Sequence, residues 1–359
     1  MTIDPRKFGA FAMTSSLRAL AGAMALALGF SAAAEANMVV RPSHAALQSR
    51  TQSFESFVAS LWPEASRRGV SRATFDAAMA GVTLDPAVID KTRKQAEFVK
   101  PVGDYLTSAV SQKRIETGRS KARDWEKWIV KAENDYGVDR YIVLGVWGLE
   151  TNFGGFAGND YVVRSLATLA YQRYRGNYFR KELIAALVIL QERNVDPAHM
   201  LGSWAGAMGQ TQFMPTSFKT YAVDFDGDGR RDIWTSVPDA IGSTANYLHK
   251  HHWIPGETWG YEVQLPNGFG HPGEAGYKSF ASWGERGVQR ADGGEMPRSG
   301  KAELLMPAGA GGPAFLVTPN FKVIKSYNNS TAYALGVALL SDRIAGWGPL
   351  KGQWPMASR

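Results

Sequence analysis

The segment that decides the fold is RYIVLGVWGLETNFGG, residues 140–155, in which one acidic side chain closes an otherwise apolar helix. Val143, Trp147 and Glu150 stand at positions i, i+4 and i+7, so the carboxyl group shares a helix face with an indole ring. Glycines thin this helix, and the pair Gly154–Gly155 is expected to end it. The pattern predicts a carboxyl group at a helix end that a bulky ligand can approach.

The surroundings of Glu150 should change its acidity. Burial disfavours the charged form of a carboxyl group, and the negative end of the helix dipole acts in the same direction. The pKa is therefore expected to rise toward the range of a general acid near neutral pH. A solvent-exposed glutamate at a helix end is the alternative interpretation, and residues elsewhere in the chain must decide between them.

A second informative segment is GSWAGAMGQTQFMPTSF, residues 202–218, which mixes small residues with polar ones and reaches a proline at a plausible helix start. Small residues let a backbone and a ligand come close, and side chains such as Ser203 and Gln212 can hydrogen-bond hydroxyl and amide groups. A glycine-rich loop that only packs helices together would explain the glycines. It would not explain the polar pair Gln210 and Gln212.

The third segment, DFDGDGRRD at residues 224–232, has carboxylates at positions 1, 3, 5 and 9 and glycine at position 6, the spacing of a calcium-binding loop. At position 12 Thr235 replaces the usual glutamate, so Asp232 or the more distant Asp239 must complete the shell. Crowded like charges would repel without a cation, although a charged turn without metal is the alternative. The predicted structural Ca²⁺ site comprises Asp224, Asp226, Asp228, the backbone carbonyl of Arg230, and Asp232.

Together these segments resemble the lytic murein transglycosylase B family (glycoside hydrolase family 103). The resemblance is carried by GLETNFG at residues 148–154, GAMGxxQFMP at 206–215 and DFDGDG at 224–229, and it extends from about Phe54 to Pro355. It implies a lysozyme-like core with a helical domain and a β domain around it. It also implies cleavage of the MurNAc-β-1,4-GlcNAc bond of peptidoglycan, without a catalytic cofactor.

The resemblance further assigns roles to residues of this chain. It implies that Glu150 is the single catalytic acid and base. Residues implied to line the sugar cleft are Ser203, Gln212, Asn328, Tyr333, Tyr247 and Tyr105.

A single carboxyl group suffices only if the substrate takes part in the reaction, because ordinary glycosidases use two. No second acid has a comparable setting: Asp160 follows in a glycine-rich loop, and Glu182 and Glu192 are expected to be surface charges on another helix. The 2-acetamido group of MurNAc can act as nucleophile, and its C6 hydroxyl can close on C1 to give a 1,6-anhydro end. Hydrolysis by a muramidase and non-catalytic peptidoglycan binding remain the alternatives.

Composition restricts the remaining choices. With 45% hydrophobic and 20% charged residues in 359, the chain is expected to be globular. The absence of cysteine excludes disulfides, thiolate metal sites, a cysteine nucleophile and a lipid-modified N-terminal cysteine. The net charge of +7 is spread without a basic block, so it suggests an anionic polymer or surface as partner but does not demand nucleic acid. The family resemblance implies that the partner is the glycan strands of peptidoglycan, bound by a monomer, with cell-wall synthesis or secretion machinery as further candidates.

The N-terminus has the pattern of an export signal. An apolar run at residues 20–30 is preceded or flanked by the basic residues Arg6, Lys7 and Arg18, and small residues follow it at 32–36. We expect a signal peptide over residues 1–34 and a soluble periplasmic protein, with an uncleaved anchor as the alternative.

The predicted fold is mainly α, in the α+β class. The expected parts are a flexible segment (35–53), a helical domain (54–134, joined by 330–359), a lysozyme-like catalytic core with the calcium loop (135–253) and a β-rich insertion (254–329). Residues 254–325 hold fourteen of the 38 glycines and seven of the 17 prolines, which favours short strands and loops there. Helices are predicted at 140–150, 163–174, 180–193, 215–221, 237–249 and 331–345, and strands at 261–265, 303–306, 314–318 and 321–326.

Overall fold

The computed structural model describes residues 53–94, 101–269 and 276–355. The predicted signal peptide and all but the last residue of the predicted flexible segment lie outside the described residues. Among the described residues, no helix is long and apolar enough to cross a membrane.

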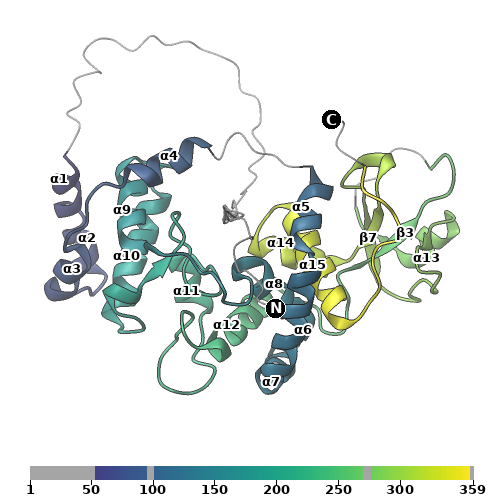
Figure 1. Ribbon diagram of the computed structural model, residues 1–359, viewed down its shortest axis with the longest axis horizontal. Coiled ribbons are helices and arrows are strands. Elements are labelled where there is room, and N and C mark those ends of the chain that lie inside the picture. Colours follow the sequence, from purple (N-terminus) through teal and green to yellow (C-terminus); the bar gives the residue numbers. More distant parts are fainter. Residues whose placement is uncertain (1–52, 95–100, 270–275, 356–359) are drawn as a thin grey trace, which may run out of the picture.

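The N-terminal helices cover two separate faces of the core. Helices α1 to α4 pack against α9 and α10, whereas α5 to α7 pack against α8, α12 and α15. Figure 1 accordingly shows α1, α2 and α3 at the opposite end of the molecule from the sheet. Their bounds are α1 (Phe54–Ala59), α2 (Trp62–Arg67), α3 (Arg72–Met79), α4 (Pro86–Lys94), α5 (Val102–Ala109), α6 (Gln112–Asp124) and α7 (Glu126–Tyr136).

The core is built around the antiparallel pair α8 and α15, which lies centrally in Figure 1. Glycine permits their close approach: a Cβ atom at Gly145 would lie 2.7 Å from the carbonyl oxygen of Val337. Asp139 caps the start of α8, and Asn152, with φ of 51°, ends it two residues before the predicted glycine pair. The core helices are α8 (Arg140–Thr151), α9 (Val162–Tyr171), α10 (Tyr178–Gln191), α11 (Pro215–Tyr221), α12 (Val237–Lys250), α14 (Pro319–Tyr327) and α15 (Thr331–Ala345).

A small antiparallel sheet forms the other end of the molecule (Figure 1). Its strands are ordered β4-β6-β7-β3-β5, and one face packs on α13 (Phe280–Glu285) around Val263, Trp283 and Leu316. The strands are β3 (Gly260–Gln264), β4 (Lys278–Ser279), β5 (Gln289–Arg290), β6 (Lys301–Leu305) and β7 (Ala314–Val317). A separate two-stranded pair joins β1 (Asp160–Tyr161) to β2 (Leu201–Gly202).

One predicted element is wrong. Residues 321–326 were expected to form a strand, but they belong to helix α14. Thr318 caps this helix by accepting a hydrogen bond from the backbone N–H of Asn320, and Pro319 occupies its first position. The short apolar run at residues 321–326 is compatible with the period of a helix and with that of a strand. The threonine–proline start signal before it indicates the helix. By contrast, α11 and α15 have the predicted bounds.

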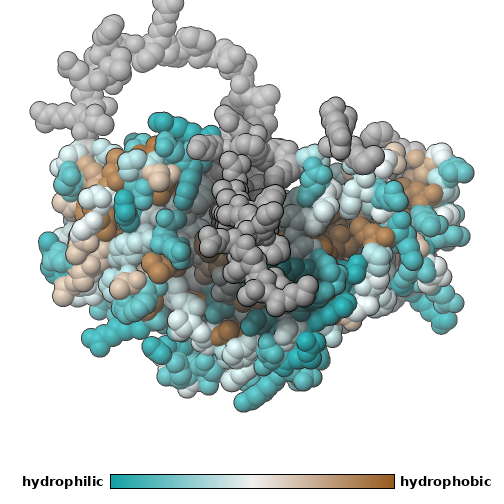
Figure 2. All heavy atoms as spheres, viewed as in Figure 1, coloured by the Kyte–Doolittle hydropathy of each residue, from teal (hydrophilic) through white to brown (hydrophobic). Residues whose placement is uncertain are grey.

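The architecture is mostly helical with one small sheet, which agrees with the predicted mainly α, α+β class. On the face shown in Figure 2, hydrophilic residues predominate, and hydrophobic residues occur in small groups over the N-terminal helices and beside the sheet.

Candidate active site

Glu150 lies in the last turn of α8 and is partly buried beside Trp147, whose indole is 2% exposed. The hydroxyl of Tyr333 donates a hydrogen bond of 2.6 Å to Oε1 of Glu150. Ser330 caps α15 and accepts the backbone N–H of Tyr333, which fixes the phenol in the first turn of that helix. The carboxyl group is thus held between the ends of two packed helices.

Burial raises the pKa of Glu150 to about 8, and the hydrogen bond from Tyr333 acts in the opposite direction. Glu150 is therefore protonated at neutral pH, as a general acid must be. No second carboxylate among the described residues contributes to this shift. The predicted rise in the pKa of Glu150 is present in the structure, and burial is its main cause.

Three tyrosines surround this carboxyl group. For Tyr105, Tyr327 and Tyr333, burial raises the phenol pKa first, and the charge of Glu150 raises it further. Tyr105 and Tyr333 are residues that the family resemblance implied. Tyr327 was not singled out from the sequence as a site residue; its hydroxyl donates to the carbonyl of Thr211 at 2.7 Å. These neutral phenols make a polar but uncharged wall beside the acid.

The loop after β2 holds the end of α8 in position through hydrogen bonds of Gln210. Its Oε1 accepts the indole N–H of Trp147 at 3.0 Å, and its backbone carbonyl accepts the hydroxyl of Thr151 at 3.0 Å. Its Nε2 donates to the carbonyl of Trp234. Sequence reasoning singled out Gln210 only as a polar residue among glycines. The structure shows that it holds residues on both sides of Glu150 in position.

The other residues implied to line a sugar cleft make internal hydrogen bonds. Ser203 Oγ accepts the N–H of Ala207, and Gln212 Nε2 donates to the carbonyls of Ala157 and Gly209. Asn328 Oδ1 accepts the N–H of Ser330, and the hydroxyl of Tyr247 donates to the carbonyl of Ser326 at 2.6 Å. These contacts shape the loops around α8, so their predicted contacts with a sugar stay predictions.

A fixed loop after α8 presents an exposed aromatic side chain, which sequence reasoning did not single out. Phe156 is 62% exposed, although its N–H donates to the carbonyl of Thr151 and the next carbonyl accepts from Gln212. Gly154 has φ of 78°, and a Cβ atom there would lie 2.5 Å from Oε1 of Gln210. The available sequence signal was an aromatic residue directly after the glycine pair.

Other acids near these segments have their own partners. Asp160 pairs with Lys91 at 3.5 Å, and Glu192 pairs with Lys219 and Arg231. Glu182, expected to be a surface charge, is in fact 2% exposed.

The burial of Glu182 has a structural cause. Its carboxyl group accepts hydrogen bonds from the backbone N–H and the hydroxyl of Thr216. Glu182 therefore joins α10 to the start of α11.

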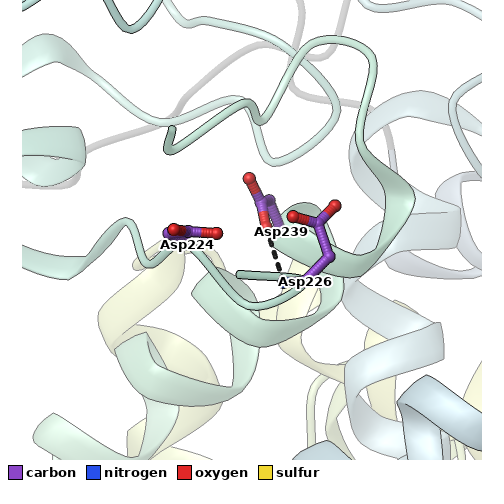
Figure 3. Close-up of side chains that lie close together, drawn as sticks. All are labelled: Asp224, Asp226 and Asp239. Carbon is purple, nitrogen blue, oxygen red and sulfur yellow. Dashed lines mark hydrogen bonds between the residues drawn. The ribbon is translucent and has the colours of Figure 1, made fainter. Parts of the chain in front are cut away.

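The acidic loop brings together Asp224, Asp226 and Asp239, whose carboxylate oxygens lie within 4.8 Å of one another (Figure 3). Asp239 is buried in the first turn of α12, and burial raises its pKa to about 6. Oxygen ligands of this kind suit Ca²⁺.

The grouping differs from the predicted loop order, in which Asp232 was preferred to Asp239. Asp232 instead accepts the N–H groups of Trp234 and Thr235. Asp228 accepts the N–H of Arg230 and pairs with its guanidinium group. The packing of α12 against the loop brings Asp239 close, which is the alternative to Asp232 that the sequence offered.

Comparison with known proteins gives consistent results. Residues 53–342 match the family described as "Transglycosylase SLT domain". The membrane-bound lytic murein transglycosylase B of Escherichia coli (strain K12) is 35% identical over 248 residues, which are 67% of this chain and 66% of that protein. This chain therefore spans slightly less than two thirds of that relative's length.

This chain is also similar to several solved structures. SltB3 of Pseudomonas aeruginosa, in complex with NAG-NAM-pentapeptide, is 47% identical with a TM-score of 0.82, over 85% of this chain and 83% of that one. SltB1 of the same organism is 33% identical with a TM-score of 0.70, over 80% and 98%. Escherichia coli Slt35 in complex with calcium is 30% identical with a TM-score of 0.67, over 81% and 92%. The likeness confirms the predicted lysozyme-like, mainly α fold and the resemblance stated from the sequence.

Proposed function

This chain belongs to the transglycosylase SLT-domain family, and on that premise we propose that it is a lytic murein transglycosylase that cleaves the MurNAc-β-1,4-GlcNAc bond of peptidoglycan. The observation that carries the proposal is the setting of Glu150: a carboxyl group with a pKa of about 8, held by Tyr333 at the end of a buried helix. Relatives named as lytic transglycosylases, and one solved with NAG-NAM-pentapeptide, support the substrate class.

The first step uses the proton of Glu150. The acid donates it to the glycosidic oxygen, while the carbonyl oxygen of the MurNAc 2-acetamido group attacks C1 and the bond to the leaving sugar breaks. The substrate thereby supplies the nucleophile that a second carboxylate provides in other glycosidases. The surroundings of Glu150 support this assignment because burial and Tyr333 alone account for its shifted pKa.

The second step returns the proton. Glu150, now a carboxylate, accepts the proton of the C6 hydroxyl, whose oxygen attacks C1 and releases the acetamido group. A 1,6-anhydro ring results and no water is consumed. The hydrogen bond from Tyr333 stabilises the carboxylate between the two steps, since donation to a charged acceptor favours the charged form. The complex of SltB3 with NAG-anhNAM-pentapeptide supports this type of product.

We propose that the sugar chain lies along the loops on either side of Glu150. Phe156 offers an exposed ring for the apolar face of a sugar. Within the described residues, the hydrogen bonds of Gln212 engage its Nε2 and leave Oε1 to accept from a substrate hydroxyl or amide. The remaining contacts proposed for the sugar come from Ser203, Asn328, Tyr247 and Tyr105.

The acidic loop is proposed to hold a structural Ca²⁺ through Asp224, Asp226 and Asp239. The complex of Slt35 with calcium supports the choice of metal. The ion would join the loop before α12 to that helix. The chain is further proposed to be exported to the periplasm by residues 1–34 and to act there as a monomer on glycan strands.

Digestion of purified sacculi tests the proposed function. We expect soluble muropeptides whose glycan ends are 1,6-anhydro-MurNAc by mass spectrometry. Reducing ends, heavier by one water, would instead identify a muramidase. The absence of soluble products would identify a non-catalytic peptidoglycan-binding protein.

A further inference from the structure

A large cavity lies at the opposite end of the α8–α15 pair from Glu150. Its volume is about 1150 Å³, and it is lined by the end of α5, the start of α8, residues 253–262 and residues 347–354. Asp139 at the start of α8 lines it, and Glu150 lies in the last turn of that helix, so about 16 Å of helix axis separates them. The cavity is therefore distinct from the proposed active site.

Aromatic rings form part of its wall, and one of them is exposed on a backbone of fixed conformation. Trp347 is 62% exposed, and its backbone N–H donates to the backbone carbonyl of Asp342 at 2.9 Å. Gly346, with φ of 103°, ends α15 in the left-handed conformation that this bond requires. The backbone at Trp347 is therefore fixed, and the indole, with only two side-chain torsions, can bind a ligand at modest cost in conformational entropy. Tyr141, Tyr261 and Trp354 also line the cavity.

Carboxylate groups also line the cavity. Asp342 accepts the indole N–H of Trp259 at 3.1 Å. Glu262 accepts the backbone N–H groups of Lys351 and Gly352, which fixes the C-terminal wall against β3. Glu257 has a buried Oε2 with no hydrogen-bond partner among the described residues. The wall thus combines ring faces with oxygen acceptors of fixed position.

The charge of the lining selects among ligands. Six acidic residues line the cavity, and only three basic ones, Arg290, Arg343 and Lys351, do so. Arg290 is already paired with Asp292 and lies over the ring of Tyr261 at 4.6 Å. A polyanion would be repelled, whereas an uncharged ligand rich in hydrogen-bond donors would be accepted.

We propose that this cavity is a second saccharide-binding site, which takes an uncharged stretch of N-acetylated glycan without cleaving it. Sugar rings have apolar faces that pack on aromatic side chains, and their hydroxyl and acetamido N–H groups donate to carboxylates. The volume exceeds that of most small-ligand sites, so several sugar rings have room. The choice of glycan rests on the proposed function. If the enzyme cleaves glycan strands as proposed, this second site holds it on a strand while Glu150 catalyses cleavage at the active site.

Calorimetric titration of the Glu150→Gln protein with tetra-N-acetylchitotetraose, an uncharged probe, tests this site. We expect two binding events. Trp347→Ala in the same background should weaken one of them at least tenfold and leave the other unchanged, and Trp347→Phe should restore most of that affinity. Phe156→Ala is the matched control, because it should weaken only the other event. Labelling with 5-fluorotryptophan should show the resonance of Trp347 shifting during the titration.

An isotherm that Trp347→Ala leaves unchanged would overturn the proposal, whether it shows one binding event or two. Binding of an oligolysine peptide at Trp347 in place of the saccharide would overturn it as well. Sacculus digestion by the Trp347→Ala enzyme with Glu150 intact separates this outcome from failure of the proposed function. Muropeptide release without a second saccharide site would refute only the cavity proposal.

Discussion

Tyr333 and Glu150 are 183 positions apart in the sequence, yet the phenol of one donates a 2.6 Å hydrogen bond to the carboxyl group of the other. The bond connects the first turn of α15 to the last turn of α8. It opposes the effect of burial on the acid, so the pKa of Glu150 reflects both influences. An acid that must donate a proton and then take one back needs such a balance.

Replacement of Tyr333 by Phe should raise the pKa of Glu150 above its present value of about 8, because a bond that stabilises the carboxylate is lost. The alkaline limb of the pH–rate profile for muropeptide release should then move to higher pH. The maximal rate should fall roughly tenfold, since the carboxylate between the two steps is less stable. Tyr247→Phe, which loses a bond to the Ser326 carbonyl, should leave the limb in place. An unshifted or lowered limb in Tyr333→Phe would contradict the assigned role.

The raised pKa of Glu150 also predicts a dependence of stability on pH. The ordinary pKa is 4.5 and the folded value is about 8. Between these values the unfolded chain has released the proton and the folded chain retains it, so stability falls as pH rises through this window. Glu150→Gln removes the effect. Its melting temperature should exceed that of the wild type by more at pH 8 than at pH 5, as calorimetry can determine; an equal difference at both values would argue against a buried acid.

Gln210→Ala should impair catalysis without touching a reacting atom. The indole N–H of Trp147 would lose its acceptor in a buried site, at a cost of about 1 to 3 kcal/mol. The end of α8 would then be less fixed, and we expect kcat to fall more than affinity for glycan. Denaturant unfolding and kinetics on sacculi measure the two effects. Loss of stability with unchanged kcat would limit Gln210 to a structural role.

Calcium should stabilise the protein through Asp224, Asp226 and Asp239. Addition of the ion in excess should raise the melting temperature by a few degrees, and chelation should reverse this, because only the folded state holds the full ligand set. Asp226→Asn should abolish most of the response. Asp228→Asn should retain it, since Asp228 pairs with Arg230. Equal losses in both variants would favour the loop order predicted from spacing.

Phe156→Ala should weaken substrate binding. The exposed ring lies on a fixed loop just beyond Glu150, so its removal should raise KM about five- to tenfold and change kcat less, as expected for loss of an apolar contact. Phe156→Tyr should behave as the wild type. An unchanged KM for Phe156→Ala on solubilised glycan strands would remove this residue from the binding surface.

The sequence predicted those features that depend on local pattern. The burial and raised pKa of Glu150 could be predicted because an apolar helical run ends in one acid, whereas its catalytic role came from the family resemblance and stays a prediction. The bounds of α15 could be predicted because Ser330 and Gly346 are strong start and stop signals. The acidic loop was recognisable from its spacing. Spacing alone named Asp239 only as the alternative to Asp232, because Asp239 comes close to the loop through the packing of α12.

Features that depend on contacts between distant segments were harder to predict from the sequence. The role of Gln210 depends on a carboxamide meeting an indole 63 residues away. The division of α1 to α7 over two faces of the core depends on which buried helix each one meets. Both outcomes arise from packing between distant segments, and periodicity within one segment does not specify the partner.

The central claim is that one carboxyl group performs both proton transfers. The most direct test compares two variants, Glu150→Gln and Asp160→Asn, in their release of anhydro-muropeptides from sacculi. Asp160 is the first acidic residue after Glu150 in the sequence. We expect Glu150→Gln to lose at least a thousandfold in rate while still binding glycan, and Asp160→Asn to remain within about twofold of the wild type. Wall digestion by Glu150→Gln at a rate near that of the wild type would contradict the account.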